Sequence, residues 1–193
     1  MADIVLIRHG ETEWSSSGQH TGRTDIGLTE RGCRQADALA PRLVDVQFGL
    51  ALTSPMARAR ETAQRAGLQA EPDPDLLEWD YGAWEGRTTA DIRATLRNPA
   101  WTIWAEPIPA GATPGEQAQD VAVRSARVIE RCLPVLAAGR SCALVAHGHV
   151  LRILAATWLG LPAIDGRLLA LAPATLSSLG FEREQRVITS WNA

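Results

Sequence analysis

The sequence contains no lysine, so all 19 of its basic residues are arginines. Without lysine there is no Schiff-base nucleophile, no anchor for pyridoxal phosphate and no Walker A phosphate loop. A bound phosphate or carboxylate has to be held by arginine, histidine, backbone N–H groups or a metal ion. Arginine favours planar, bidentate contacts with oxyanions, which suits phosphate binding. The arginine-rich composition is also typical of a GC-rich coding bias, so individual arginine positions have to carry the argument.

Several other features are scarce. The three cysteines, Cys33, Cys132 and Cys142, are widely spaced and form no C-x-x-C pair, which favours a reducing compartment over a disulfide framework. No apolar run approaches the roughly 20 residues that span a bilayer, and no secretory signal opens the chain. The net charge of −3 argues against general nucleic-acid binding, which needs a basic face. We therefore expect a cytoplasmic protein that binds neither nucleic acid nor a membrane.

A chain of 193 residues is most simply a single domain that buries roughly 70% of its unfolded surface. Short apolar runs alternate with amphipathic stretches, which predicts an α/β fold: three layers, α/β/α, around a mostly parallel sheet. The predicted strands are 4–7, 50–53 and 142–146, followed by an antiparallel pair at 175–182 and 186–191. The predicted helices are 29–44, 55–67, 114–136 and 150–159. The looser segment 78–114, with a short helix at 89–96, is expected to cover the active site.

Three sequence features predict where helices begin and end. Ser54 followed by Pro55 is typical of a helix cap with proline in the first turn. Thr113 and Glu116 have the spacing of a capping box, which predicts the start of the long helix at 114–136. Pro134 is expected to kink the last turn of that helix or to end it early.

Two of the three apolar strands end in a His-Gly step, Arg8-His9-Gly10 and Ala146-His147-Gly148. The strand at 50–53 ends at Ser54, and Arg58 follows on the first turn of the next helix. Because parallel strands present their carboxyl ends at one edge, histidines and arginines should converge on one crevice beside helix N-termini. Such a crevice suits a phosphoryl group.

These motifs resemble the histidine phosphatase superfamily, the phosphoglycerate mutase-like proteins. The similarity runs through Leu6 to Thr12, Thr21-Gly22, Asp25, Leu28-Thr29, Gly32, Ser54 to Thr62, Glu78 to Gly82, Glu85-Gly86 and Ala146 to Gly148. The sequence is most similar to a phosphatase branch that includes sedoheptulose-bisphosphatase-like proteins and bacterial broad-specificity acid phosphatases. The resemblance implies the phosphoglycerate mutase-like fold and a hydrolase that needs no cofactor.

The resemblance also implies roles for individual residues. His9 would be the nucleophile that carries a phosphohistidine, and Glu78 the general acid and base. Arg8, Arg58 and His147 would neutralise the transferring phosphoryl oxygens. The expected substrate contacts are Ser15, Thr21, Gly22, Tyr81, Gly148, His149 and Arg152. Ser15 departs from the family, which commonly has asparagine there, and Arg152 is the candidate for a second anionic group of the substrate.

The pair His147-x-His149 also suggests a metal site, because two histidines two residues apart on a turn can chelate. No carboxylate or third histidine stands at ligand spacing, and His20 would have to come from a loop. We therefore expect no metal. Trp101 and Trp104 have the spacing of an apolar lid over the crevice, although packing of segment 78–114 is the alternative.

The favoured function is hydrolysis of a small phosphorylated metabolite, for instance a sugar phosphate, by a metal-independent phosphomonoesterase. Two alternatives stay open: a phosphoglycerate mutase, and a non-catalytic phosphate-binding module. A mutase needs more basic residues to hold a bisphosphate, yet no arginine lies between Arg97 and Arg124. A monomer and a homodimer both fit the sequence pattern.

Overall fold

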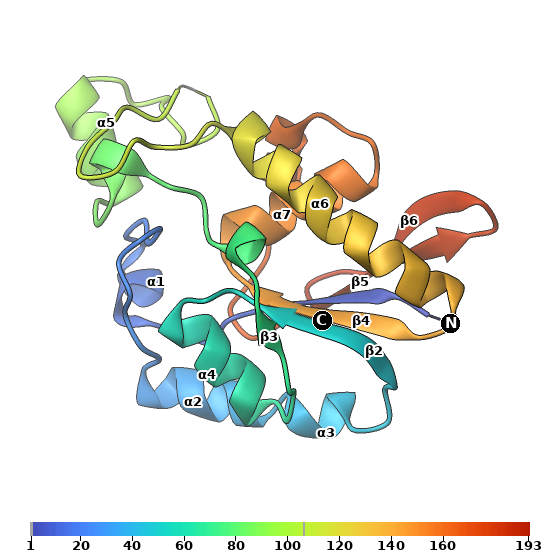
Figure 1. Cartoon of the computed structure of the whole chain (residues 1–193). Coiled ribbons are helices and arrows are strands. Elements are labelled where there is room, and N and C mark those ends of the chain that lie inside the picture. The colour runs from blue at the N-terminus through green and yellow to red at the C-terminus, as the bar shows by residue number, and fades with distance from the viewer. Residues whose placement is uncertain (1, 106) are drawn as a thin grey trace.

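A six-stranded mixed sheet forms the centre of the protein (Figure 1). The computed structural model describes residues 2–105 and 107–193. The strand order is β3-β2-β4-β1-β5-β6. The strands are β1 (Ile4–Arg8), β2 (Phe48–Thr53), β3 (Glu71–Pro72), β4 (Ser141–Ala146), β5 (Leu176–Glu182) and β6 (Gln185–Ser190). Strands β3, β2, β4 and β1 are parallel, whereas β5 and β6 run antiparallel at the other edge. The predicted α/β/α architecture is confirmed.

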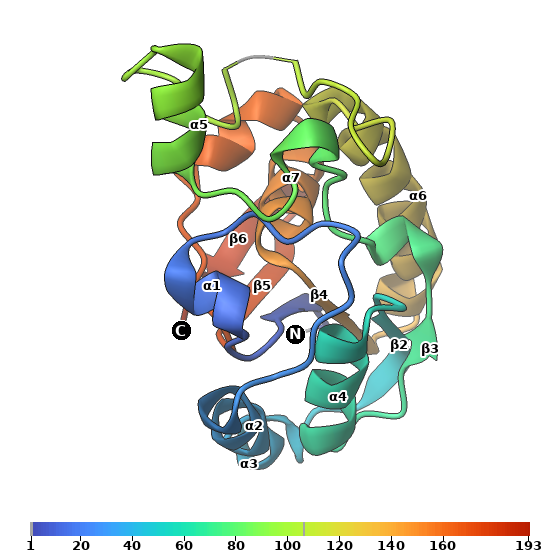
Figure 2. The same cartoon turned by 90° about the vertical axis from the view of Figure 1, so that its left-hand side faces the viewer.

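Helices cover both faces of the sheet (Figure 1 and Figure 2). The α-helices are α1 (Glu13–Ser17), α2 (Glu30–Asp37), α3 (Ala40–Leu43), α4 (Ala57–Arg65), α5 (Thr89–Leu96), α6 (Ala118–Ala137) and α7 (Gly148–Trp158). Three short 3₁₀ helices span Pro74–Leu76, Gly82–Trp84 and Ala163–Leu168. Helices α6 and α7 lie on one face, and α2, α3 and α4 lie on the other. Within the described ranges, no helix is long and apolar enough to cross a membrane.

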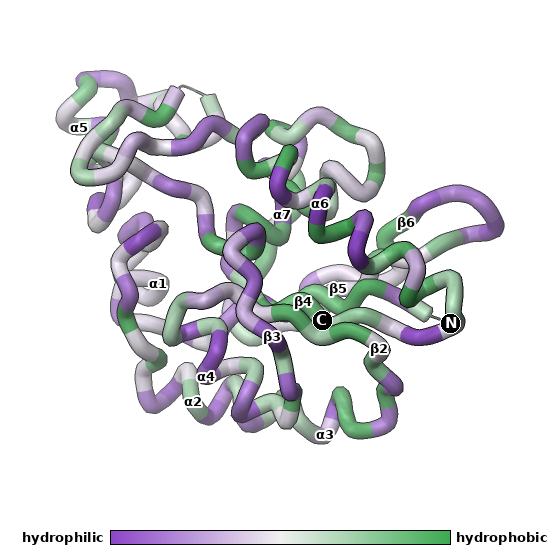
Figure 3. Tube along the Cα trace, viewed as in Figure 1, coloured by the Kyte–Doolittle hydropathy of each residue, from purple (hydrophilic) through white to green (hydrophobic). Residues whose placement is uncertain are grey.

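The core follows from the alternation of side chains along the central strands. In β1, Ile4 and Leu6 pack in the cluster on the α6–α7 side, whereas Val5 and Ile7 pack in the cluster under α2 and α4. Because a parallel strand flanked by helices is buried on both faces, its sequence is a continuous apolar run. Figure 3 shows the same continuity as hydrophobic colour along β2 and β4.

The predicted helix 29–44 is wrong as a single element. Thr29 does cap α2, because its hydroxyl accepts a hydrogen bond from the Gly32 N–H. The helix nevertheless ends at Asp37, and a separate turn, α3, carries Pro41 near its start. Proline has no N–H to donate back along a helix, so it fits the first turn of a new helix better than the interior of a longer one.

Two further predictions about helix ends need correction. Helix α4 begins at Ala57 rather than at Pro55, and the Asp25 carboxylate accepts the Ala57 N–H at 2.8 Å in place of a local cap. Helix α6 begins at Ala118 with a capping box between Gln117 and Asp120. The predicted capping residue of that helix, Thr113, donates its hydroxyl hydrogen to Asp80 instead.

Pro134 does not end α6 early, because the helix continues to Ala137.

The pairing of β1 with β4 brings His9 and His147 together at one edge of the sheet. Arg8 lies opposite Ala146 in the parallel register, so the next residues, His9 and His147, leave the sheet side by side. The His9 N–H donates to the Ala146 carbonyl at 2.9 Å, and the Ser54 N–H donates to the Val145 carbonyl at 2.9 Å. Three strand ends therefore meet at one edge of the sheet.

Candidate active site

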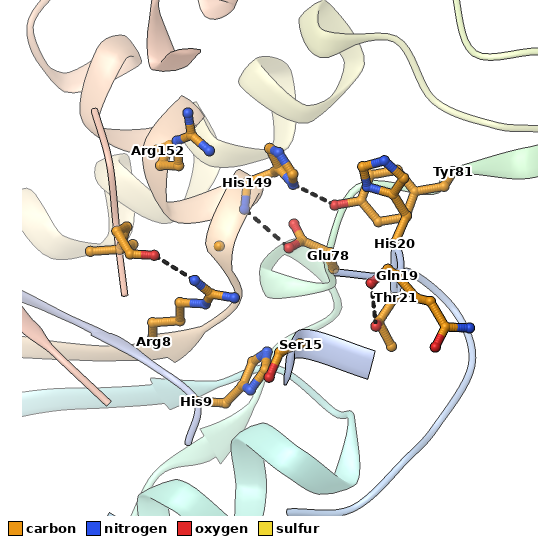
Figure 4. Close-up of a pocket in the computed structure, with 12 residues that line it drawn as sticks. Arg8, His9, Ser15, Gln19, His20, Thr21, Glu78, Tyr81, His149 and Arg152 are labelled. Carbon is orange, nitrogen blue, oxygen red and sulfur yellow. Dashed lines mark hydrogen bonds between the residues drawn. The ribbon is translucent and has the colours of Figure 1, made fainter. Parts of the chain in front are cut away.

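A cavity of about 100 Å³ lies at this edge (Figure 4). Its walls come from the end of β1, the segment around α1, the chain before the second 3₁₀ helix, and the start of α7. The residues that line it are Arg8, His9, Ser15, Gln19, His20, Thr21, Glu78, Tyr81, Gly148, His149, Arg152 and Leu171. Gly22, Arg58 and His147 are absent from this lining, although each touches a residue that the sequence places in the site.

His9 has the protonation state of a nucleophile. Its Nδ1 lies 2.7 Å from the Gly10 carbonyl oxygen. Since a carbonyl only accepts, Nδ1 carries the proton and the lone pair is on Nε2. Burial, followed by the guanidinium charges of Arg58 and Arg8, holds the pKa of His9 well below its ordinary value. The ring is therefore neutral near pH 7, as attack on phosphorus requires.

His147 lies directly behind His9, with the ring centroids 5.1 Å apart in an edge-on arrangement. Its Nδ1 accepts from Arg58 Nε at 3.1 Å, so Nε2 carries the hydrogen and donates to the Ser54 hydroxyl at 2.7 Å. Burial and the Arg58 charge lower the pKa of His147 well below the usual range. Because both ring nitrogens are engaged, His147 has no lone pair available for a metal ion in this arrangement.

Arg58 is fully buried on the first turn of α4. Besides His147, it donates to the carbonyl oxygens of Thr21, Gly22 and Thr24, at 3.0–3.1 Å. The guanidinium thus fixes the loop 21–24 against the histidine pair. Among the described residues no carboxylate forms an ion pair with Arg58, so its charge is not neutralised by a direct contact.

Arg8 supplies the cationic floor of the cavity. One Nη donates to the Leu171 carbonyl at 2.5 Å, while Nε is buried without a hydrogen-bond partner. No carboxylate within the described ranges forms an ion pair with Arg8. Arg8 is partly buried, and a charged group removed from water without a counter-ion is costly unless an anion binds beside it. This geometry favours an oxyanion ligand.

Glu78 is the only acidic residue in the lining described above, and it is only 4% exposed. Its carboxylate accepts N–H groups from His149 at 3.0 Å and from Val150 at 2.8 Å, both in the first turn of α7. It also accepts the N–H of Trp79 at 2.9 Å. A helix N-terminus stabilises a carboxylate, so these contacts hold Glu78 in a fixed position at the cavity wall.

The predicted contacts Ser15, Thr21 and Gly22 have other partners in this structure. The Ser15 hydroxyl closes a capping box with Thr12, donating to its carbonyl and accepting its N–H. The Thr21 hydroxyl donates to the Gln19 carbonyl at 3.2 Å. The Gly22 N–H donates to the Glu85 carboxylate at 3.0 Å, so Gly22 shapes the loop from outside the cavity. Ser15 and Thr21 line the cavity, but their hydroxyl hydrogens are already donated.

Aromatic rings and Arg152 form the wall farther from His9. The Tyr81 hydroxyl lies 2.6 Å from His149 Nδ1, and burial raises the pKa of Tyr81 well above its ordinary value. Trp104 packs on the His149 ring with centroids 5.0 Å apart, and the Arg152 guanidinium lies 4.8 Å from the Trp104 ring centre. Trp101 is buried in the core. The two tryptophans therefore pack segment 78–114, with Trp104 also supporting the cavity wall.

Arg152 is held by backbone carbonyls. Its Nε donates to Gly166 and one Nη to Arg167, each at 3.0 Å. Together with Arg8 it gives the lining two guanidinium groups and one carboxylate, a net positive charge. Gly148 begins α7 between them, and its backbone lies beside Arg8.

Sequence reasoning missed Gln19 and Leu171 as lining residues, and it considered His20 only as a metal ligand. His20 packs on Tyr81 with ring centroids 5.0 Å apart, and its Nε2 is buried without a hydrogen-bond partner. Burial lowers the pKa of His20 to about 4. The position of His20 directly before the motif Thr21-Gly22 could have indicated that it lies near the site. The direction of its ring depends on the pairing of Gln19 with Thr88, which the sequence does not reveal.

The chain is similar to known phosphatases. The sequence profile of the histidine phosphatase superfamily (branch 1) matches residues 4–193. An acid phosphatase of Mycobacterium tuberculosis is 36% identical over 186 residues, covering 95% of this chain and 88% of the relative. Sedoheptulose 1,7-bisphosphatase of Saccharomyces cerevisiae is 35% identical over 190 residues, covering 81% of this chain and 67% of the relative.

A solved structure of a mycobacterial glucosyl-3-phosphoglycerate phosphatase superposes with a TM-score of 0.86 at 30% identity, covering 100% of both chains.

Proposed function

The chain belongs to the histidine phosphatase superfamily, and from this premise we propose that it is a metal-independent phosphomonoesterase with His9 as its nucleophile. The observation that carries the proposal is the state of His9: a buried, neutral imidazole with Nδ1–H bound to Gly10 and the Nε2 lone pair free. A cationic cavity lies beside it. This combination favours attack on a phosphoryl group that Arg8 holds.

The reaction has two steps. In the first, His9 Nε2 attacks phosphorus, the ester P–O bond breaks, and Glu78 gives a proton to the leaving alkoxide. In the second, water attacks the phosphohistidine, Glu78 accepts a proton from that water, and inorganic phosphate leaves with His9 neutral again. Arg8, together with Arg58 behind the wall, offsets the charge of the transferring phosphoryl oxygens. The neutral His147 ring holds Arg58 in place through its Nδ1. No step requires a metal ion.

The substrate that fits best is a small phosphorylated metabolite such as a sugar phosphate. The lining offers polar hydrogen-bonding groups on His20, Tyr81 and His149, which suit a hydroxylated carbon chain. Arg152 stands at the far wall, where it would hold a second anionic group of the substrate. The sugar-phosphate names of two of the relatives support the same class.

Three broader expectations belong to this proposal. The chain acts as one domain, with segment 78–114 covering the cavity through Tyr81 and the tryptophans packed around it. It works in the cytoplasm on a small-molecule substrate, without nucleic acid or membrane as a partner. Its candidate oligomeric form is a homodimer. Sedimentation at micromolar concentration and fractionation of cells test the last two.

The decisive experiment traps the intermediate. The protein is incubated with a radiolabelled phosphomonoester and quenched in alkali, where phosphohistidine survives. We expect an alkali-stable, acid-labile label on the wild type and none on His9→Ala. A label at another residue would refute the mechanism, and so would loss of turnover on adding a chelator.

The phosphoglycerate mutase alternative is decided by the product. 3-Phosphoglycerate should yield free phosphate, whereas a mutase would yield 2-phosphoglycerate. A non-catalytic binding module would bind phosphate, acquire no label and release no product.

A further inference from the structure

We propose that Arg124, paired with Glu116, is a positioning residue for Glu78. In this inference, the pair fixes the backbone on both sides of Glu78 and so aims its carboxylate at the leaving oxygen. The inference rests on the proposed function, because it takes Glu78 as the proton donor. Neither Arg124 nor Glu116 lines the cavity.

Arg124 lies on α6 and is only 6% exposed. One Nη donates to the carbonyl oxygens of Asp75 and Leu77, and the other donates to the Glu78 carbonyl at 3.2 Å. A single guanidinium therefore holds three backbone carbonyls within the four residues that end at Glu78. A planar group with donors in fixed directions can do this, whereas an ammonium group cannot.

Glu116 holds the chain on the other side of Glu78. Its carboxylate accepts the Asp80 N–H at 3.0 Å, and its backbone N–H donates to the Asp80 carbonyl at 3.0 Å. Its own carbonyl accepts the Trp79 indole N–H at 2.7 Å. The same carboxylate pairs with Arg124 in two hydrogen bonds, at 3.0 Å and 3.1 Å. The bidentate ion pair thus joins the contacts on the two sides of Glu78. We call this pair, Arg124 with Glu116, the brace.

Glu78 is consequently fixed at both ends by different helices. Glu116, just before α6, and Arg124, in the second turn of α6, set its backbone. The first turn of α7 sets its carboxylate through the N–H groups of His149 and Val150. Proton transfer needs a donor within about 2.6–3.2 Å of the leaving oxygen, and a shift of about 1 Å can cost about 100-fold in rate. The brace supplies this alignment without touching the substrate.

A purely structural role for Arg124 is the competing explanation, and α6 offers a matched control. Arg127 projects from the same helix and pairs with the Asp75 side chain, in the same segment that Arg124 holds. It is exposed, and we see no contact from Arg127 to Leu77 or Glu78 in the described part of the chain. Arg127→Lys therefore perturbs the attachment of this segment to α6 without releasing the backbone of Glu78.

The experiment compares Arg124→Lys, Arg127→Lys and Glu78→Gln on two substrates of different leaving-group quality. An alkyl phosphate needs a proton on its leaving oxygen, whereas 4-nitrophenyl phosphate leaves as a stabilised anion. The measured quantity is kcat/KM, which reports formation of the phosphohistidine, the step in which Glu78 donates its proton. We expect Arg124→Lys to lower kcat/KM about 10- to 100-fold for the alkyl ester and less than about threefold for the aryl ester. Glu78→Gln should share this selectivity, and Arg127→Lys should leave both rates unchanged.

Circular dichroism establishes that each variant is folded. If Arg124→Lys does not fold, Glu116→Gln replaces it, since the amide keeps the size of the side chain while removing the charge that pairs with Arg124. The selective loss is then expected in that variant. Equal slowing of both esters, or no slowing of either, would overturn the positioning role while a selective Glu78→Gln leaves the proposed function standing. An unselective Glu78→Gln would overturn the proton-donor role of Glu78 and this inference with it.

Discussion

Replacement of His20 by glutamine should make the protein less sensitive to acid. His20 packs against Tyr81 at the cavity wall, and burial lowers its pKa from 6.5 to about 4. The unfolded chain therefore binds a proton near pH 6.5 that the folded protein accepts only near pH 4. Between these values the unfolded state holds more protons, so the free energy of unfolding falls as the pH falls. The stabilisation is complete above pH 6.5 and is lost progressively as the pH drops through 4.

The size of the effect follows from the two pKa values. At about pH 5 the unfolded imidazole is almost fully protonated, whereas the folded one is protonated in about a tenth of molecules. The resulting loss of stability through His20, relative to about pH 8, is about 2 kcal/mol. His9, His147 and His149 shift the stability in the same direction. His9 and His147 are present in both proteins and cancel when wild type and His20→Gln are compared. The charge of His20 also contributes to the lowered pKa of His149, so its removal reduces the acid sensitivity in the same direction.

The assay is urea unfolding of wild type and His20→Gln at about pH 8 and about pH 5. Glutamine is uncharged at both values, so the difference in stability between the two pH values should be about 2 kcal/mol smaller in the variant. Any pH-independent effect of the substitution is removed by taking this double difference. Equal losses in the two proteins would refute the assignment of a low pKa to His20, and so would an NMR titration of its ring near pH 6.5.

Two further changes test the packing around the histidine pair. Ser54→Ala should lower the free energy of unfolding by about 1–3 kcal/mol, because it leaves the buried His147 Nε2–H without an acceptor; urea unfolding showing no loss would contradict that tautomer. Gly10→Ala should cost about 1–3 kcal/mol or more, because its Cβ would overlap the Gly32 carbonyl, whereas Gly27→Ala, with open space around the new Cβ, should cost nothing by this mechanism. Similar unfolding midpoints for the two alanine variants would refute the steric argument.

Much of the fold could be predicted because strand patterns are local. The apolar runs before His9 and His147 mark β1 and β4, and the helix at 89–96 begins and ends as expected. Helix starts were less predictable when the capping group came from elsewhere. The α4 cap is the Asp25 carboxylate, 32 residues before Ala57 along the chain, and no local pattern reveals it.

The site shows the same division. The shared edge of parallel strands predicted that the chain after β1 and the chain after β4 meet, and the family resemblance added Glu78. His9, Glu78 and His149 do line one cavity. The sequence could not assign the individual hydrogen bonds. Gly22 has its N–H bound to Glu85, a partner that only tertiary structure brings near. The brace of Arg124 was equally hidden, because a helix arginine 46 residues from Glu78 gives no local signal.

The mutual contacts between α4 and the loop before α2 have a consequence for folding. The loop residue Asp25 caps the start of the helix, and the helix residue Arg58 in turn binds the loop carbonyls of Thr21, Gly22 and Thr24. Each segment thus supplies the polar partners that the other lacks, so neither is fully hydrogen-bonded until both are docked. The two segments should order as one cooperative unit, with slow and simultaneous hydrogen exchange. Arg58 therefore reaches its position beside His147 in the same step in which the two segments dock.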